Sequence, residues 1–114
     1  MSKMIEQDTT WKPNPDDIPQ LKAEADAGNA VSQYNLGLCY ANGNGVEVDL
    51  AEAVKWFRKA AEQGLPEAQH NLGICLSRGA GVEKNVAEGA MWLNSAAQQG
   101  DDEAERMLKR WWGD

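Results

Sequence analysis

Cysteine and histidine are scarce in this chain, and this limits the metal and redox chemistry it can support. The 114 residues include two cysteines, Cys39 and Cys75, and one histidine, His70. Two cysteines are too few for a disulfide framework, and their spacing matches no zinc-binding pattern. We therefore expect free thiols in a fold that holds no metal ion and no cofactor.

Positive charge is also in deficit. Eleven lysines and arginines against 18 aspartates and glutamates give a net charge of −7. Nucleic acids and anionic lipid surfaces repel a chain of this charge. The sequence thus predicts no nucleic-acid partner and no membrane partner, and its charge is compatible with a basic protein partner.

Long hydrophobic runs are absent as well. No stretch of about 18 apolar residues occurs, so we expect no transmembrane helix. The first ten residues contain Glu6 and Asp8 and lack the apolar segment of a secretory signal. As written, the chain is expected to be cytoplasmic, and removal of a native leader would change that expectation.

What the sequence does contain is an internal repeat. A shift by 36 positions aligns residues 29–64 with residues 65–100 without a gap and gives 16 identical pairs. Gly28, Gly64 and Gly100 mark the same point of successive units. Units of this length bury a continuous core only when they stack. The sequence therefore predicts two full repeats with half a unit on either side.

Each repeat is predicted to form two helices. The first helix is expected over Ala30–Ala41 and Pro66–Ser77, and the second over Leu50–Gln63 and Val86–Gln99. Apolar residues recur at helical spacing along these ranges, and glycines follow them as stops.

The starts of the second helices carry a more specific signal. Asp49 and Asn85 suit the N-cap position, and Glu52 and Glu88 follow three residues later. This spacing is typical of a capping box, in which the cap and the later glutamate bond each other's backbone N–H groups.

Single helices are expected at both ends of the repeats. One begins with Asp17 as its cap and runs to about Ala27, and the other covers Asp102–Trp112. Residues 1–16 are expected to be extended or disordered. The predicted fold over residues 17–112 is all-α, a right-handed α-solenoid of helix–turn–helix repeats with about six helices.

The repeats resemble those of a known family. The segments YNLGLCY at 34–40, GNGV at 43–46 and KAAEQG at 59–64 look like one unit of the Sel-1-like repeat family, a subclass of tetratricopeptide-like solenoids. The second repeat is similar, and the resemblance extends from about Pro19 to Leu108. It implies a noncatalytic adaptor that holds a partner protein or peptide in a superhelical groove.

One branch of that family is secreted and carries cysteine pairs that bridge the two helices of each repeat. Ala61 and Gln69 stand near those places here, so the resemblance does not extend to the disulfides. Any activity peculiar to that branch, such as hydrolysis, is not expected.

In tetratricopeptide-like stacks the first helices line the concave side. Beside their core face lies the predicted binding groove, which comprises Tyr34, Asn35, Leu38, Asn42, His70, Asn71, Ile74, Arg78, Arg106 and Arg110. Four of these side chains are basic or ionisable to a cation, so an acidic peptide or a terminal carboxylate is the expected ligand. The alternative is an ordinary solvated face, compensated by Glu67 and Glu103.

The chain's last two tryptophans, Trp111 and Trp112, leave two interpretations open. They form either a hydrophobic plug that caps the stack or an exposed end that docks another chain. The second interpretation makes the protein a self-assembling structural unit, although a monomer is favoured.

Side chains that suggest chemistry have structural explanations. Cys39 and Cys75 are expected in the core, as are Trp56 and Trp92. The carboxylates cluster at helix starts, where they satisfy free N–H groups. No nucleophile, base and orienting group come together, so we do not expect an enzyme.

Overall fold

The computed structural model describes the chain from residue 17 to residue 113, apart from the side chain of Trp112. The predicted extended segment, residues 1–16, lies outside the described residues. The described part contains six α-helices and no strand: α1 (Ile18–Asp26), α2 (Ala30–Asn42), α3 (Leu50–Glu62), α4 (Pro66–Arg78), α5 (Val86–Gln98) and α6 (Asp102–Trp112). The predicted all-α fold is confirmed, and the helix bounds agree to within a residue.

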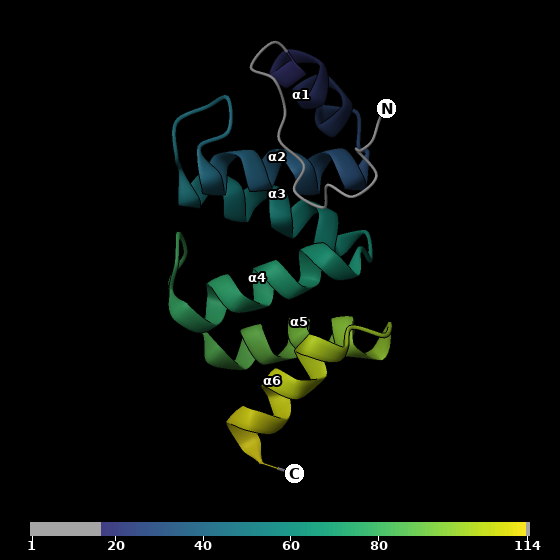
Figure 1. Ribbon diagram of the computed structural model, residues 1–114, viewed down its shortest axis with the longest axis vertical. Helices are drawn as coiled ribbons and strands as arrows, with labels where there is room; N and C mark the ends of the chain where they lie inside the picture. Colours follow the sequence, from purple (N-terminus) through teal and green to yellow (C-terminus); the bar gives the residue numbers. More distant parts are fainter. Residues whose placement is uncertain (1–16, 114) are drawn as a thin grey trace, which may run out of the picture.

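The helices stack in chain order. Each packs mainly on the helix before it and the helix after it, and Figure 1 shows the stack running from α1 at one end to α6 at the other. Helices α2, α4 and α6 are the first helices of their units, and α1, α3 and α5 are second helices. None of the described helices is both long and apolar enough to cross a bilayer.

Local signals fix most helix ends. Gly43 and Gly79 follow α2 and α4 in the left-handed conformation, each with φ of 73°, as the prediction required. Asn29 caps α2 by accepting a hydrogen bond from the backbone N–H of Ser32 at 2.9 Å. Asp17 stands at the N-cap of α1 but makes no capping bond there. The predicted cap is wrong because Asp17 has helical dihedral angles and not the extended ones that aim a cap side chain at the N–H groups.

The capping box forms only in part. Asp49 and Asn85 accept the expected bonds from the backbone N–H groups of Glu52 and Glu88, at 3.1 and 2.9 Å. The return bonds are absent, because the backbone N–H of Asp49 donates to the carbonyl of Tyr40 at 2.9 Å, and that of Asn85 likewise bonds the preceding helix. Both glutamates are therefore free to pair with other side chains.

The two helices of each repeat approach closely at a glycine. A Cβ added to Gly73 would lie 2.7 Å from Cγ of Leu93, and one added to Gly37 would lie 2.7 Å from the ring of Phe57. Lys109 occupies the equivalent place in α6, where its side chain is 64% exposed and pairs with Glu105 at 3.5 Å. No described helix packs against Lys109, so a charged side chain is accommodated where the two repeats carry glycine.

The core runs along the stack in three linked clusters. Leu36, Cys39 and Trp56 pack under α1, Leu72 and its neighbours join α3 to α4, and Leu93 packs under α6. Cys39 and Trp56 are buried as predicted. Their counterparts in the second repeat, Cys75 and Trp92, are only half-buried, which corrects the expectation for those two.

Buried glutamines join one repeat to the next. The side-chain amide of Gln69 donates to the carbonyl of Ala61 at 3.2 Å and accepts a bond from Nε2 of Gln99 at 2.9 Å. Gln33 and Gln63 repeat this arrangement one unit earlier. Each pair ties a first helix to the end of the second helix of its own repeat, and the bonds to Ala25 and Ala61 cross to the unit before.

Candidate binding groove

The first helices of three successive units share a polar cavity. Its volume is about 270 Å³, and α2, α4 and the start of α6 supply its lining, which comprises Tyr34, Glu67, His70, Asn71, Asp101 and Glu103. We call it the groove cavity.

The repeat explains how these side chains meet. Tyr34 and His70 occupy equivalent positions, 36 residues apart, in the second turns of α2 and α4. Asp101 is the N-cap of α6 and accepts a bond from the backbone N–H of Ala104 at 3.0 Å. Stacking places this cap beside the second turn of the preceding first helix, so Asp101 comes to lie against His70.

The closest polar contact in the cavity joins His70 to Asp101. Nδ1 of His70 lies 2.7 Å from Oδ2 of Asp101, and Nε2 lies 3.9 Å from Oε1 of Glu103. An ionised carboxylate only accepts hydrogen bonds, so Nδ1 carries the proton that is shared with Asp101. Burial alone would raise the pKa of Asp101, but the bonds from the Ala104 backbone and from His70 outweigh it and hold that pKa below its usual value.

Tyr34 forms the opposite wall. Its ring packs against Phe57 at a centroid distance of 5.9 Å. Partial burial raises the pKa of the Tyr34 hydroxyl, and the charge of Glu67 raises it further against the lowering effect of a hydrogen bond with Asn71. The hydroxyl therefore stays protonated and remains available as a hydrogen-bond donor.

The structure brings only part of the predicted groove together. Tyr34, His70 and Asn71 line the cavity, whereas seven predicted residues do not, namely Asn35, Leu38, Asn42, Ile74, Arg78, Arg106 and Arg110. The cavity lies near the N-terminal ends of the first helices, and Arg78 ends α4 two turns beyond His70, about 12 Å along the axis. Of the predicted basic residues, His70 lines the cavity and the three arginines do not.

The carboxylates of the cavity were interpreted from sequence as caps or as compensating charges. Glu67 and Glu103 do lie near His70, as expected, but with Asp101 they make up half of the lining. The spacing of 31 residues between His70 and Asp101 is the signal that could have revealed the pair. It places an N-cap of one unit beside the second turn of the unit before it.

A metal-ligand group and an acidic thiol are the two reactive centres to consider among the described side chains. Among residues 17–113, no group of three histidine, cysteine or acidic side chains is arranged to hold a metal ion. Burial raises the pKa of the Cys75 thiol, against a lowering effect of Arg78, so this thiol is not an activated nucleophile. The cavity offers hydrogen bonding and negative charge.

The predicted docking end is only partly described. Trp111 lies in the last turn of α6 and is 38% exposed. The side chain of Trp112 is outside the described part of the chain, so docking through this end stays a prediction.

Comparison with known proteins supports the same fold. The Sel1 repeat family matches residues 30–65 and 66–101, one residue later than the predicted repeat bounds. A Sel1 repeat protein from Oxalobacter formigenes is 43% identical with a TM-score of 0.74, and the match covers 80% of this chain and 38% of that one. Helicobacter pylori cysteine rich protein B shares the fold, at 24% identity and a TM-score of 0.78 over 83% of this chain and 72% of that one.

Two further relatives are much longer than this chain. A protective antigen of uropathogenic Escherichia coli with an SLR fold is 32% identical with a TM-score of 0.64, and the match covers 82% of this chain and 28% of the antigen. The secretory immunoglobulin A-binding protein EsiB of Escherichia coli O6:H1 is 45% identical over 43 residues, which are 38% of this chain and 9% of that protein. The two matched repeats, the six stacked helices and these likenesses together show that the chain belongs to the Sel1 repeat family.

Proposed function

We propose that this protein is a noncatalytic interaction module that holds a segment of a partner protein across α2, α4 and α6. The observation that carries the proposal is the groove cavity, because it crosses first helices of three successive units. Tyr34 and Asn71 present a hydroxyl and an amide there, and such groups bond the backbone of an extended segment.

The charge of the cavity favours one kind of segment. Glu67, Asp101 and Glu103 surround it, and the hydrogen bonds that Asp101 accepts outweigh its burial and keep it ionised at neutral pH. A lysine, an arginine or a free N-terminus would complement these carboxylates. The acidic ligand expected from sequence would depend on Arg106 and Arg110, which lie outside the lining.

The likeness to an immunoglobulin A-binding protein supports protein binding as the activity of such repeats. It names no partner for this chain, since only a small part of that protein is matched. The groove cavity is small, about 270 Å³, so we expect a modest affinity for an isolated peptide.

A displayed library of random peptides would test the proposal. We expect selection on the wild-type protein to enrich peptides with lysine or arginine, and Glu67→Gln/Glu103→Gln to abolish that enrichment. These changes keep side-chain shape and leave the Asp101 cap intact. Arg106→Gln/Arg110→Gln serves as the matched control, because it also neutralises two charged side chains, on the neighbouring surface.

Each outcome is informative. Loss of binding only in the arginine variant would favour the acidic ligand that the sequence predicted. It would also reject the groove cavity as the binding site. Enriched peptides that bind all three proteins equally would place the interaction outside the first helices. Circular dichroism of each variant confirms that the helices are retained.

A further inference from the structure

The second helices of the two repeats differ in the residues beside their shared tryptophan. In α3, Nζ of Lys59 lies 5.5 Å from the centroid of the Trp56 ring. A cation at this distance is attracted by the negative face of the indole. The equivalent residues in α5 are Ser95 and Trp92, so the second repeat keeps the ring and lacks the cation.

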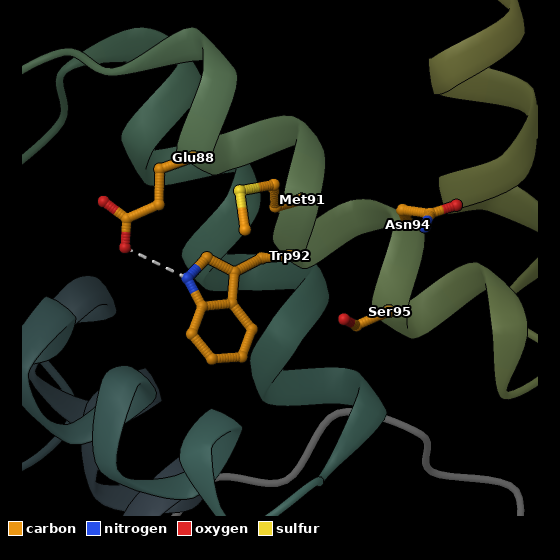
Figure 2. A pocket seen from close by; sticks show the side chains of 5 residues that line it. All are labelled: Glu88, Met91, Trp92, Asn94 and Ser95. Atoms are coloured by element: carbon orange, nitrogen blue, oxygen red, sulfur yellow. Dashed lines mark hydrogen bonds between the residues drawn. The ribbon is translucent and has the colours of Figure 1, made fainter.

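A cavity lies where the lysine is missing. Its volume is about 330 Å³, and it is lined by Glu88, Met91, Trp92, Asn94 and Ser95. Figure 2 shows the Trp92 indole in this cavity with Glu88 bonded to its nitrogen and Met91 close by. Trp92 is half-buried, whereas Trp56 is only 6% exposed. We call this space the Trp92 cavity.

A second substitution opens the same surface. Lys55 in α3 pairs with Glu52 at 3.6 Å. Its counterpart in α5 is Met91, whose side chain is apolar and 68% exposed. The second repeat thus has neither of the two lysines that the first repeat carries on this surface, and an apolar side chain stands in place of one of them. The thioether of a methionine adapts readily to the shape of an incoming side chain.

Glu88 supplies a fixed negative charge at the edge of the cavity. It accepts bonds from Nη1 of Arg58 at 2.9 Å and from Nε1 of Trp92 at 3.2 Å. Both bonds lower the pKa of Glu88, and the bond from Arg58 has the larger effect. Glu88 is therefore ionised at neutral pH. Both bonds end on Oε2, and neither uses Oε1. Arg58 offsets part of the charge, so the indole face is the main attraction for a cation.

We propose that the Trp92 cavity is a docking site for a lysine or arginine side chain of a partner protein. The incoming side chain takes the place that Lys59 takes over Trp56 in the first repeat. Its methylene stem packs on Met91 and on the indole, and its charged end lies over the ring and near Glu88. The net charge of −7 adds a long-range attraction for a basic partner. The site lies on α5, so it is independent of the groove proposed on the first helices.

Nuclear magnetic resonance of the full chain would test this site directly. The indole N–H signal of Trp92 is assigned by its loss in Trp92→Phe. It is then followed during titration with capped Gly-Lys-Gly or Gly-Arg-Gly. Capped Gly-norleucine-Gly has a similar stem without the charge. We expect a saturating shift with the basic peptides, weakened by salt, and none with norleucine.

Two matched variants sharpen the result. Ser95→Lys gives the second repeat the lysine that the first repeat already carries. It should keep the fold and weaken the fitted peptide affinity about fivefold or more, because the chain's own lysine occupies the ring. Lys59→Ser makes the reverse change one repeat away and should leave the Trp92 response unchanged.

Several results would overturn the proposal. These are no shift at tens of millimolar peptide, an equal response to norleucine, or equal binding by Ser95→Lys. A Trp92 signal that moves when the protein alone is diluted would assign the site to a second copy of the chain, and so would reject a partner protein as the source of the cation.

Discussion

The glutamine pair Gln69–Gln99 offers a direct test of how one repeat is fastened to the next. Gln69 is 5% exposed, donates to the carbonyl of Ala61 and accepts from Gln99. We expect Gln69→Ala to destabilise the fold because it removes both bonds from a buried place between repeats. Each is worth about 1 kcal/mol net. The lost burial of a methylene adds up to about 1 kcal/mol.

The expected total is about 2–3 kcal/mol, and it is limited by partners that remain. The carbonyl of Ala61 still accepts from the backbone N–H of Gly64 at 2.9 Å. The amide of Gln99 still donates to the carbonyl of Gly64 at 3.0 Å. Neither group is therefore left without a partner, which keeps the cost below that of an orphaned buried group.

Urea denaturation followed by circular dichroism would measure this cost. Gln99→Ala should destabilise the fold by about 1–2 kcal/mol, and the double variant should show a coupling of about 1 kcal/mol between the two positions. The neighbouring Gln98→Ala is the control, since Gln98 is exposed and should change stability by less than about 0.5 kcal/mol. If Gln69→Ala costs no more than Gln98→Ala, the pair does not fasten the repeats and our reasoning fails.

Three further predictions follow from single contacts. Gly73→Ala should lower the free energy of unfolding by about 1–3 kcal/mol, and with it the urea midpoint, because the added Cβ meets Leu93 at 2.7 Å; an unchanged midpoint would mean that the helices separate at no cost. Asn85→Ala should cost about 1 kcal/mol by removing the bond to the backbone N–H of Glu88, and Asn85→Asp should restore it. The pKa of Asp101 is lowered on folding, so its contribution to stability is present above its ordinary pKa of about 4 and is lost as pH falls through the lower folded value. Asp101→Asn keeps a cap acceptor but does not titrate, so its urea midpoint should fall less steeply in acid; parallel curves would refute this linkage.

The sequence by itself determined the repeat, the helices and the fold class. These follow from the repeat length, from the helical spacing of apolar residues and from caps that act within one unit. Examples of such caps are Asn29 before α2 and the glycines Gly43 and Gly79 after α2 and α4. The identity of the glutamines across repeats was also visible, as Gln33 matches Gln69, but nothing in the spacing indicated that they bond the preceding unit.

The tertiary structure alone decided what the surfaces carry. It placed Asp101 against His70 and left the predicted arginines outside the cavity lining. It also left Trp92 half-buried, whereas Trp56 is buried. Such neighbours come from different units, and their separation depends on how each unit is rotated on the one before. That rotation is set by side-chain packing between helices and not by the spacing of residues along the chain.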